Sequence, residues 1–210
     1  FKNVDGTEDL LYAATAVESP ALGEDKTVML TFSHLLSKVK FSFTNGFDNK
    51  FITFDVKNIR IVDAPKSGDI DLAVENWWDN NDWVLGTDKV ELNFGDACEQ
   101  LAIGGKQESA FERLTIPAGA DKEYTVTFKV EQYIGDVNLN AGAPVELTST
   151  IKGVTFEAGK AYNFIATVTP ESLDLKEIVF AEPTIDDWNN ADINLGEVGN
   201  TEVHVVYSAD

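Results

Sequence analysis

Alternation of apolar and polar residues with a period of two is the feature that most constrains how this chain folds. It is longest in the stretch EYTVTFKVEQY, residues 123–133. Successive side chains of a β-strand point to opposite faces, so this pattern predicts a strand with one buried and one exposed face. The predicted buried face carries Tyr124, Val126, Phe128 and Val130.

The same alternation recurs along the chain and predicts an all-β fold. It places Val39, Phe41 and Phe43 on one face of a second strand, and a one-step shift between Val56 and Ile59 predicts a β-bulge in a third. Further alternating stretches are residues 27–32, 89–94, 161–169 and 201–208. Only residues 33–38 have helical character, over one turn at most. Short strands separated by Gly- and Asn-containing turns predict an antiparallel β-sandwich.

A change in composition indicates where the chain divides. Turn residues and acids accumulate between Ala64 and Asn81. We therefore expect two units: residues 1–75, as the C-terminal part of an N-terminal sandwich, and residues 76–210, as a C-terminal sandwich.

Charge excludes one class of partner. The 210 residues carry a formal net charge of −20, and nucleic-acid affinity depends on clustered Lys and Arg, so we expect no nucleic-acid binding. No run of 18 apolar residues is present, so no membrane-spanning helix is expected. The single cysteine, Cys98, has no basic neighbour in sequence that would activate it, and we interpret it as a structural residue.

His34 is the residue that most resembles part of a catalytic site. Ser33 is adjacent to it and Ser37 follows three residues later. In a strand, however, Ser33 points to the opposite face, and no G-x-S-x-G motif is present. We interpret His34 as structural, and we predict a protein without catalytic residues, metal ligands or cofactors.

The segment NWWDNNDW allows two interpretations. Flat indole rings among carboxylates and amides are typical of sugar-binding surfaces. Alternatively, the tryptophans anchor a loop against the sandwich. The acids lack the spacing of a calcium-binding loop. The predicted glycan platform consists of Trp77, Trp78, Trp83, Asp79 and Asp82.

Several motifs occur in an order that resembles the fimbrillins, the subunits of lipoprotein-derived pili of gut and oral Gram-negative anaerobes. The most specific is DLLYA at residues 9–13, followed by VMLTFSHLLSKVKFSF at residues 28–43. LTIPAG and YTVTFKV lie within residues 114–130, FEAGKAYNFIATVTP at residues 156–170 and TIDDW at residues 184–188. On this resemblance, the segment around His34 is a strand signature.

The resemblance implies a structural pilus subunit or surface adhesin built from two transthyretin-like β-sandwiches. It implies export as a lipoprotein precursor to the outer membrane and the fimbrium, and polymerisation with other pilin subunits by strand exchange. Host or bacterial surface glycans or proteins are further expected partners. Only eight residues precede Asp9, so on this resemblance we expect the first sandwich to be incomplete and the lipid anchor to lie outside this chain.

The alternating segment TEVHVVYSAD is suited to pair with another strand. Val203, Val205 and Tyr207 share one face, and the preceding GEVGN offers a flexible hinge. The segment is either a donor strand for a neighbouring subunit or an edge strand of its own sandwich. A carbohydrate-binding module at the cell surface, using the platform above, is the alternative function.

Overall fold

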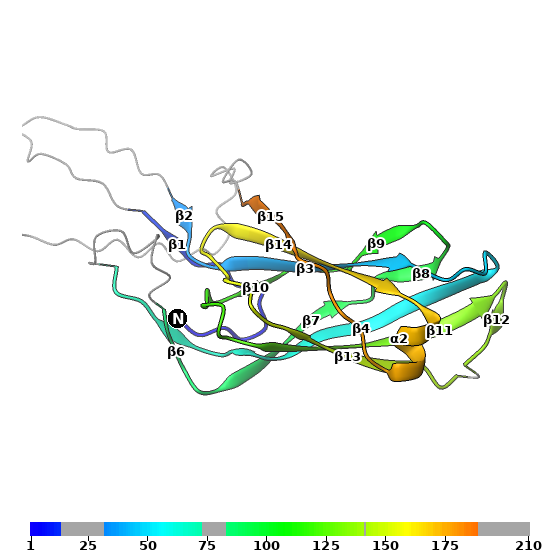
Figure 1. The fold of residues 1–210 in the computed structure, drawn as a ribbon. Helices are drawn as coiled ribbons and strands as arrows, with labels where there is room; N and C mark the ends of the chain where they lie inside the picture. The colour runs from blue at the N-terminus through cyan, green and yellow to red at the C-terminus, as the bar shows by residue number, and fades with distance from the viewer. Residues whose placement is uncertain (14–31, 73–82, 141, 189–210) are drawn as a thin grey trace, which may run out of the picture.

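A computed structural model describes residues 1–13, 32–72, 83–140 and 142–188, which are mostly β-strand (Figure 1). Two larger sheets pack on each other, and two short strand pairs lie beside them. The elements are β1 Leu11–Tyr12, β2 Ser33–His34, β3 Ser37–Asn45, β4 Ile52–Pro65, β5 Gly68–Asp69, β6 Val84–Leu85, β7 Lys89–Gly95, β8 Cys98–Leu101, β9 Lys106–Glu108, β10 Arg113–Thr115, β11 Tyr124–Ile134, β12 Val137–Asn138, β13 Val145–Ile151, β14 Lys160–Val168, α2 Pro170–Leu175 and β15 Thr184–Asp187.

The first larger sheet has the order β10-β3-β14-β15, and β9 also pairs with β3. The second has the order β12-β11-β4-β7, with β13 on β11 and β8 on β4. All of these pairs are antiparallel except β3 with β14, which run parallel from Lys38 beside Ala161 to Asn45 beside Val168. The all-β sandwich prediction is confirmed, with this one parallel pair as a departure from the predicted antiparallel arrangement.

The core lies between the two larger sheets and uses the faces that the alternation predicts. Tyr124, Val126, Phe128 and Val130 of β11 are all buried. Aromatic rings from both sheets meet in this core: Phe41 lies 4.8 Å from Phe94, and Phe43 lies 4.9 Å from Phe128, between ring centroids. Burial of such rings is the largest favourable contribution that these residues make to folding.

The predicted bulge between Val56 and Ile59 is present in β4. The pairing of β4 with β11 shifts between Thr127 and Lys129. At the bulge Asn58 has φ of 55°, a left-handed conformation that Asn tolerates better than most residues. Its backbone N–H donates to Asp96 Oδ1 at 2.7 Å. The extra residue allows inward-facing residues to continue on the same side of the sheet.

The predicted division into residues 1–75 and 76–210 is not what the sheets show. Strands β3 and β4 come from the first range, yet they pair with β14 and β11 from the second. Their buried residues belong to the same core. Strand pairing between residues about a hundred positions apart leaves no trace in local composition, so the turn-rich stretch was mistaken for a domain boundary.

Residues 33–38 do not form the helical turn considered above, because Ser33–His34 and Ser37–Asn45 are strands. A short helix instead occupies Pro170–Leu175. Thr169 and Ser172 cap its first turn reciprocally, with Ser172 N–H donating to Thr169 Oγ1 at 3.2 Å. The sequence Thr-Pro-x-Ser was the available signal for this helix. Among the described residues, no helix has the length and apolar character needed to cross a membrane.

Phe180 offers a test of whether the segment after α2 belongs to the sandwich. Its ring lies 5.2 Å from Phe41 and 6.2 Å from Phe164, between centroids. We expect Phe180→Ala to lower the free energy of unfolding by about 3 kcal/mol, because it leaves a cavity in the core. The control is Val179→Ala, at a residue that is 81% exposed, which should change it by less than about 0.5 kcal/mol. The two free energies of unfolding are measured by urea denaturation. Equal losses for Phe180→Ala and Val179→Ala would contradict the packing of Phe180 in the sandwich.

Candidate functional site

His34 is hydrogen-bonded to Asp9, the first residue of the DLLYA motif. The distance from His34 Nδ1 to Asp9 Oδ2 is 2.7 Å. Pairing of β1 with β2 positions these two residues, since Leu11 lies opposite His34 and the Leu35 N–H donates to the Leu10 carbonyl at 2.9 Å. His34 is 7% exposed. A buried polar ring of this kind is stable only when its nitrogens have partners, and Asp9 supplies one.

Trp188, which directly follows β15, covers the His34 ring. The two rings stack with centroids 3.5 Å apart and an interplanar angle of 10°. Lys38 Nζ lies 4.5 Å from the centroid of the Trp188 ring, a cation–π distance. The backbone N–H of Trp188 donates to the Gly159 carbonyl at 2.8 Å. We call Asp9, His34, Lys38 and Trp188 the His34 cluster.

The sequence did not reveal this cluster, although each of its residues lies in one of the fimbrillin-like motifs. The residues of the cluster are separated by up to 179 positions in the chain, from Asp9 to Trp188, and the order of the motifs does not indicate which side chains touch. The available signal was that one motif contains Asp9, a second contains His34 and Lys38, and a third ends in Trp188. The parallel pairing of β3 with β14 is what brings the turn at Gly159 beside the Leu36 backbone, whose carbonyl accepts from the Gly159 N–H at 3.0 Å.

The surroundings of His34 support its interpretation as a structural residue. Ser33 is exposed while His34 is buried, as expected for neighbours on opposite faces of a strand. The Ser37 hydroxyl donates to the Glu157 carbonyl at 2.8 Å. Neither serine is therefore oriented for activation by His34, which needs a direct hydrogen bond to a nucleophile.

Only one residue of the predicted glycan platform lies in the described part of the chain. Trp83 is 8% exposed and packs with Leu35, Leu36, Leu114 and Ile116 in a second apolar cluster, separate from the main core. Its ring is therefore buried in this cluster, and its Nε1 has no hydrogen-bond partner among the described residues. Trp77, Trp78, Asp79 and Asp82 lie outside the described residues.

A polar groove of about 710 Å³ is lined by residues of the second sheet, including Lys57 and Tyr133, and by Gln107 and Glu108 of β9. Within it Lys57 Nζ lies 2.7 Å from Glu131 Oε2 and 3.2 Å from Asp55 Oδ2. The hydrogen bond from Lys57 holds the pKa of Glu131 below its usual value, and the bond with Glu131 raises the pKa of Lys57. Both groups thus stay charged near neutral pH, which is unsuited to general acid–base catalysis. Within the described ranges, no three His, Cys, Asp or Glu side chains are grouped to hold a metal ion.

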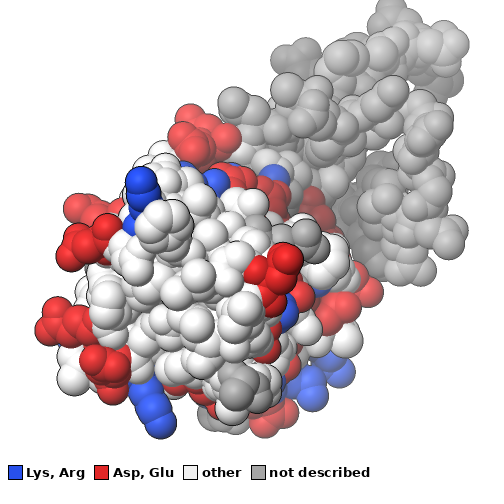
Figure 2. Space-filling view, turned by 90° about the vertical axis from the view of Figure 1, so that its right-hand side faces the viewer, with Lys and Arg blue, Asp and Glu red and all other residues white. Residues whose placement is uncertain are grey.

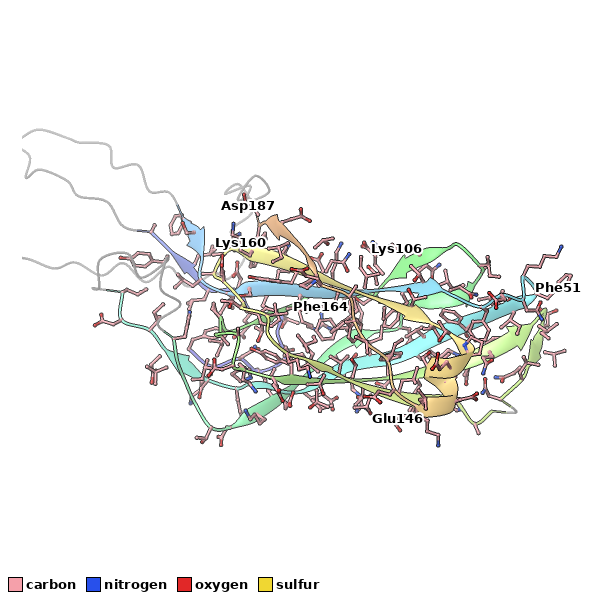
Figure 3. The ribbon with its side chains drawn as sticks, in the orientation of Figure 1. Phe51, Lys106, Glu146, Lys160, Phe164 and Asp187 are labelled. Atoms are coloured by element: carbon pink, nitrogen blue, oxygen red, sulfur yellow. The ribbon has the colours of Figure 1, made fainter. Side chains whose placement is uncertain are left out.

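The edges and one end of the sandwich are more suited to contact with other proteins. All four residues of β15 are exposed, and β15 pairs with β14 at the edge of the first sheet. Lys160 and Asp187 form an ion pair across these two strands (Figure 3). The predicted donor residues Val203, Val205 and Tyr207 lie outside the described residues.

The end of the sandwich opposite Lys160 and Asp187 carries exposed apolar side chains. Phe51 lies at its tip (Figure 3), and Ile134 and Val137 pair in the β11–β12 turn nearby. Phe51 and Val137 are about two thirds exposed. In the view onto this end, acidic side chains lie around a largely uncharged centre (Figure 2). Apolar groups gathered on a surface commonly mark protein contacts.

His34→Ala should reduce stability without removing any enzymatic activity. We expect a loss of about 1–3 kcal/mol in the free energy of unfolding, because Asp9 loses its partner and Trp188 its stacking surface. His34→Phe keeps a ring for Trp188 and should lose less. Urea denaturation measures both. A hydrolytic activity of the wild-type chain that disappears in folded His34→Ala would overturn the structural interpretation.

Two substitutions at Trp83 separate packing from hydrogen bonding. Trp83→Ala should cost about 3–5 kcal/mol of stability, since it empties the centre of the second apolar cluster. Trp83→Phe should cost clearly less, because the lost Nε1–H has no hydrogen-bond partner in the part of the chain that the structure describes. Thermal unfolding of both variants provides the measurement. Similar losses in both variants would show that the indole N–H is needed.

Comparisons with known proteins agree with the fold. No curated protein matches the chain. Among solved structures, a proposed cell adhesion protein from Parabacteroides distasonis has a TM-score of 0.50 at 11% identity, covering 77% of this chain and 54% of that one. A fimbrial protein from Bacteroides vulgatus has a TM-score of 0.45 at 14% identity, covering 76% and 56%. This chain therefore spans about half the length of these proteins, and the first of the two likenesses, at 11% identity, supports the fold alone.

A sequence profile gives the stronger result. The profile of the fimbrillin-like family matches residues 4–188, which include every motif named above and all members of the His34 cluster. The match ends at Trp188, the last residue of the described sandwich. The chain belongs to the fimbrillin-like family.

Proposed function

We propose that this chain is a structural subunit of a cell-surface fimbria that joins its neighbours by β-strand addition and has no catalytic activity. Family membership supports a role in fimbriae or adhesion. The observation that carries the proposed mode of assembly is the exposed edge strand β15. A strand at the edge of a sheet has backbone N–H and C=O groups that another strand can pair with.

The alternation of residues 201–208 supports a donor role for this segment, because it offers one apolar face to a neighbouring sheet. The family profile ends at Trp188, before the segment begins. A donor strand must be able to leave its own subunit without opening that subunit's core. Val203, Val205 and Tyr207 would then fill apolar positions on a neighbour.

The absence of catalysis is supported by what the most reactive groups contact. His34 is paired with Asp9 and covered by Trp188. Lys57 and Glu131 neutralise each other. These contacts use the side chains for cohesion between strands. A structural subunit needs this cohesion more than it needs an accessible base or nucleophile.

The proposed location is the cell surface, with export as a lipoprotein precursor to the outer membrane. Other pilin subunits are the proposed partners, and the exposed apolar end around Phe51 is a second surface for such contacts. Recognition of host or bacterial glycans or proteins stays a prediction. For a glycan platform, Trp77 and Trp78 are the remaining candidates, since Trp83 is buried.

Deletion of residues 200–210 tests the donor role. We expect the truncated chain to remain a folded monomer with an unchanged melting temperature, and to lose the ability to form oligomers. Thermal unfolding and analytical ultracentrifugation measure the two properties. A truncated monomer that melts several degrees lower would show that the segment closes its own sandwich, because its removal leaves core residues uncovered.

A matched pair of triple variants sharpens this test. Replacing Val203, Val205 and Tyr207 with Ser removes one face of the predicted strand, and replacing Glu202, His204 and Val206 with Ser changes the other. The first variant should fail to form oligomers while the second still assembles. Equal assembly by both would contradict insertion of the apolar face into a neighbour.

A further inference from the structure

The His34 cluster joins segments from both ends of the described sandwich. Asp9 precedes β1, His34 ends β2 and Trp188 follows β15. One His34 ring contacts both of the others: its Nδ1 faces Asp9 at 2.7 Å and its face stacks on Trp188 at 3.5 Å. His34 thus lies between Asp9 and Trp188 and is the residue that contacts both.

Both segments have few contacts of their own. The β1–β2 pair has two residues in each strand, and a short isolated hairpin is unstable in water. Its neighbours Leu10, Leu35 and Leu36 hold it on the second apolar cluster, and Trp188 packs against the same cluster. Strand β15 has four residues, all exposed, and its ion pair between Asp187 and Lys160 lies at the surface, where such pairs contribute little. The stacked rings are therefore a direct side-chain contact that links the two segments.

Trp188 is itself fixed from several directions. Its backbone is bound to Gly159, and Lys38 lies over its ring. Lys38 Nζ is in turn 3.3 Å from Glu112 Oε2. These contacts hold the indole in one orientation against His34. Because the indole is held in one orientation, a displacement of β15 is transmitted to His34 more effectively than it would be through a mobile ring.

We propose that the His34 cluster couples the β1–β2 hairpin to β15, so that the two segments become ordered or disordered together while the main core stays folded. The coupling is reciprocal, because a contact that stabilises one segment through His34 stabilises the other to the same extent. One consequence rests on the proposed function. If a neighbouring subunit orders β15 in an assembly that uses residues 201–208 as donor strand, the β1–β2 hairpin of the same subunit as that β15 becomes ordered as well.

Hydrogen exchange read by mass spectrometry on the 210-residue chain tests the coupling. Trp188→Leu removes the stacked ring and should raise exchange at least about tenfold in residues 9–12 and 33–36, as well as in 184–187. Asp9→Ala should produce the reciprocal result, with faster exchange in residues 184–187. The amides of β11 should be unchanged in both variants, since they lie in the main core.

Two controls isolate the His34 cluster. Ile185→Ala alters an exposed residue of β15 outside the cluster, and Asp5→Ala removes a nearby carboxylate that binds Thr7 instead of His34. Neither should affect the opposite segment. If Trp188→Leu also raises amide exchange in β11, the comparison uses Trp188→Phe instead, because this variant keeps an aromatic ring. Trp188→Phe should then accelerate residues 9–12 together with 184–187, by less than Trp188→Leu does.

Independent behaviour would overturn the proposal. This is the case if the Trp188 variants change only residues 184–187, or if Asp9→Ala changes only residues 9–12 and 33–36. The measurement uses the isolated chain and does not depend on assembly. It can therefore fail while the deletion of residues 200–210 still abolishes oligomers, and it can succeed when that deletion has no effect.

Discussion

The parallel pairing of β3 with β14 is the constraint on which the rest of the structure depends. It joins residues 38–45 to residues 161–168, more than a hundred positions apart, through eight successive residue pairs. This register places Phe41 opposite Phe164, and both rings enter the main core. Loop closure over this distance costs conformational entropy that only the combined burial of both strands can offset.

The same register determines the surroundings of His34. The turn before β14 contains Gly159. Its carbonyl accepts from the backbone N–H of Trp188, and its own N–H donates to the Leu36 carbonyl. Any added Cβ at Gly159 would lie 3.6 Å from the His34 carbonyl oxygen, and the residue has φ of 70°, which favours glycine. The end of β15 is thus attached beside the start of β3. A slip of one residue would exchange the two faces of β3 and separate these contacts.

The balance of charge and apolar surface fits a protein that works by contact with other proteins. A net charge of −20 keeps the bulk of the surface hydrated and opposes unspecific association between copies. Under the proposed function, specific association would use surfaces where charge is sparse, such as the end around Phe51 (Figure 2), or backbone pairing at an edge such as β15. These two types of contact differ in how they specify a partner: side-chain shape in the first and strand register in the second.

Local pattern in the sequence predicted β3, β4, β7, β11 and β14, their buried faces and the bulge at Asn58, because side-chain alternation is a property of consecutive residues. It missed β13 and most of the short strands, and the predicted strands at residues 27–32 and 201–208 lie outside the described residues, apart from Phe32. The motifs also determined the family, and the isolation of His34 from any nucleophile motif was sufficient to interpret it as structural. Only the tertiary structure decided which strands pair. That pairing replaced two predicted units by shared sheets, made β3 and β14 parallel and brought Trp188 onto His34. It also placed Trp83 in an apolar cluster, whereas its acidic sequence neighbours had left a surface position open. Pairing between distant strands depends on the burial of whole faces against each other, and no short stretch of residues contains that information.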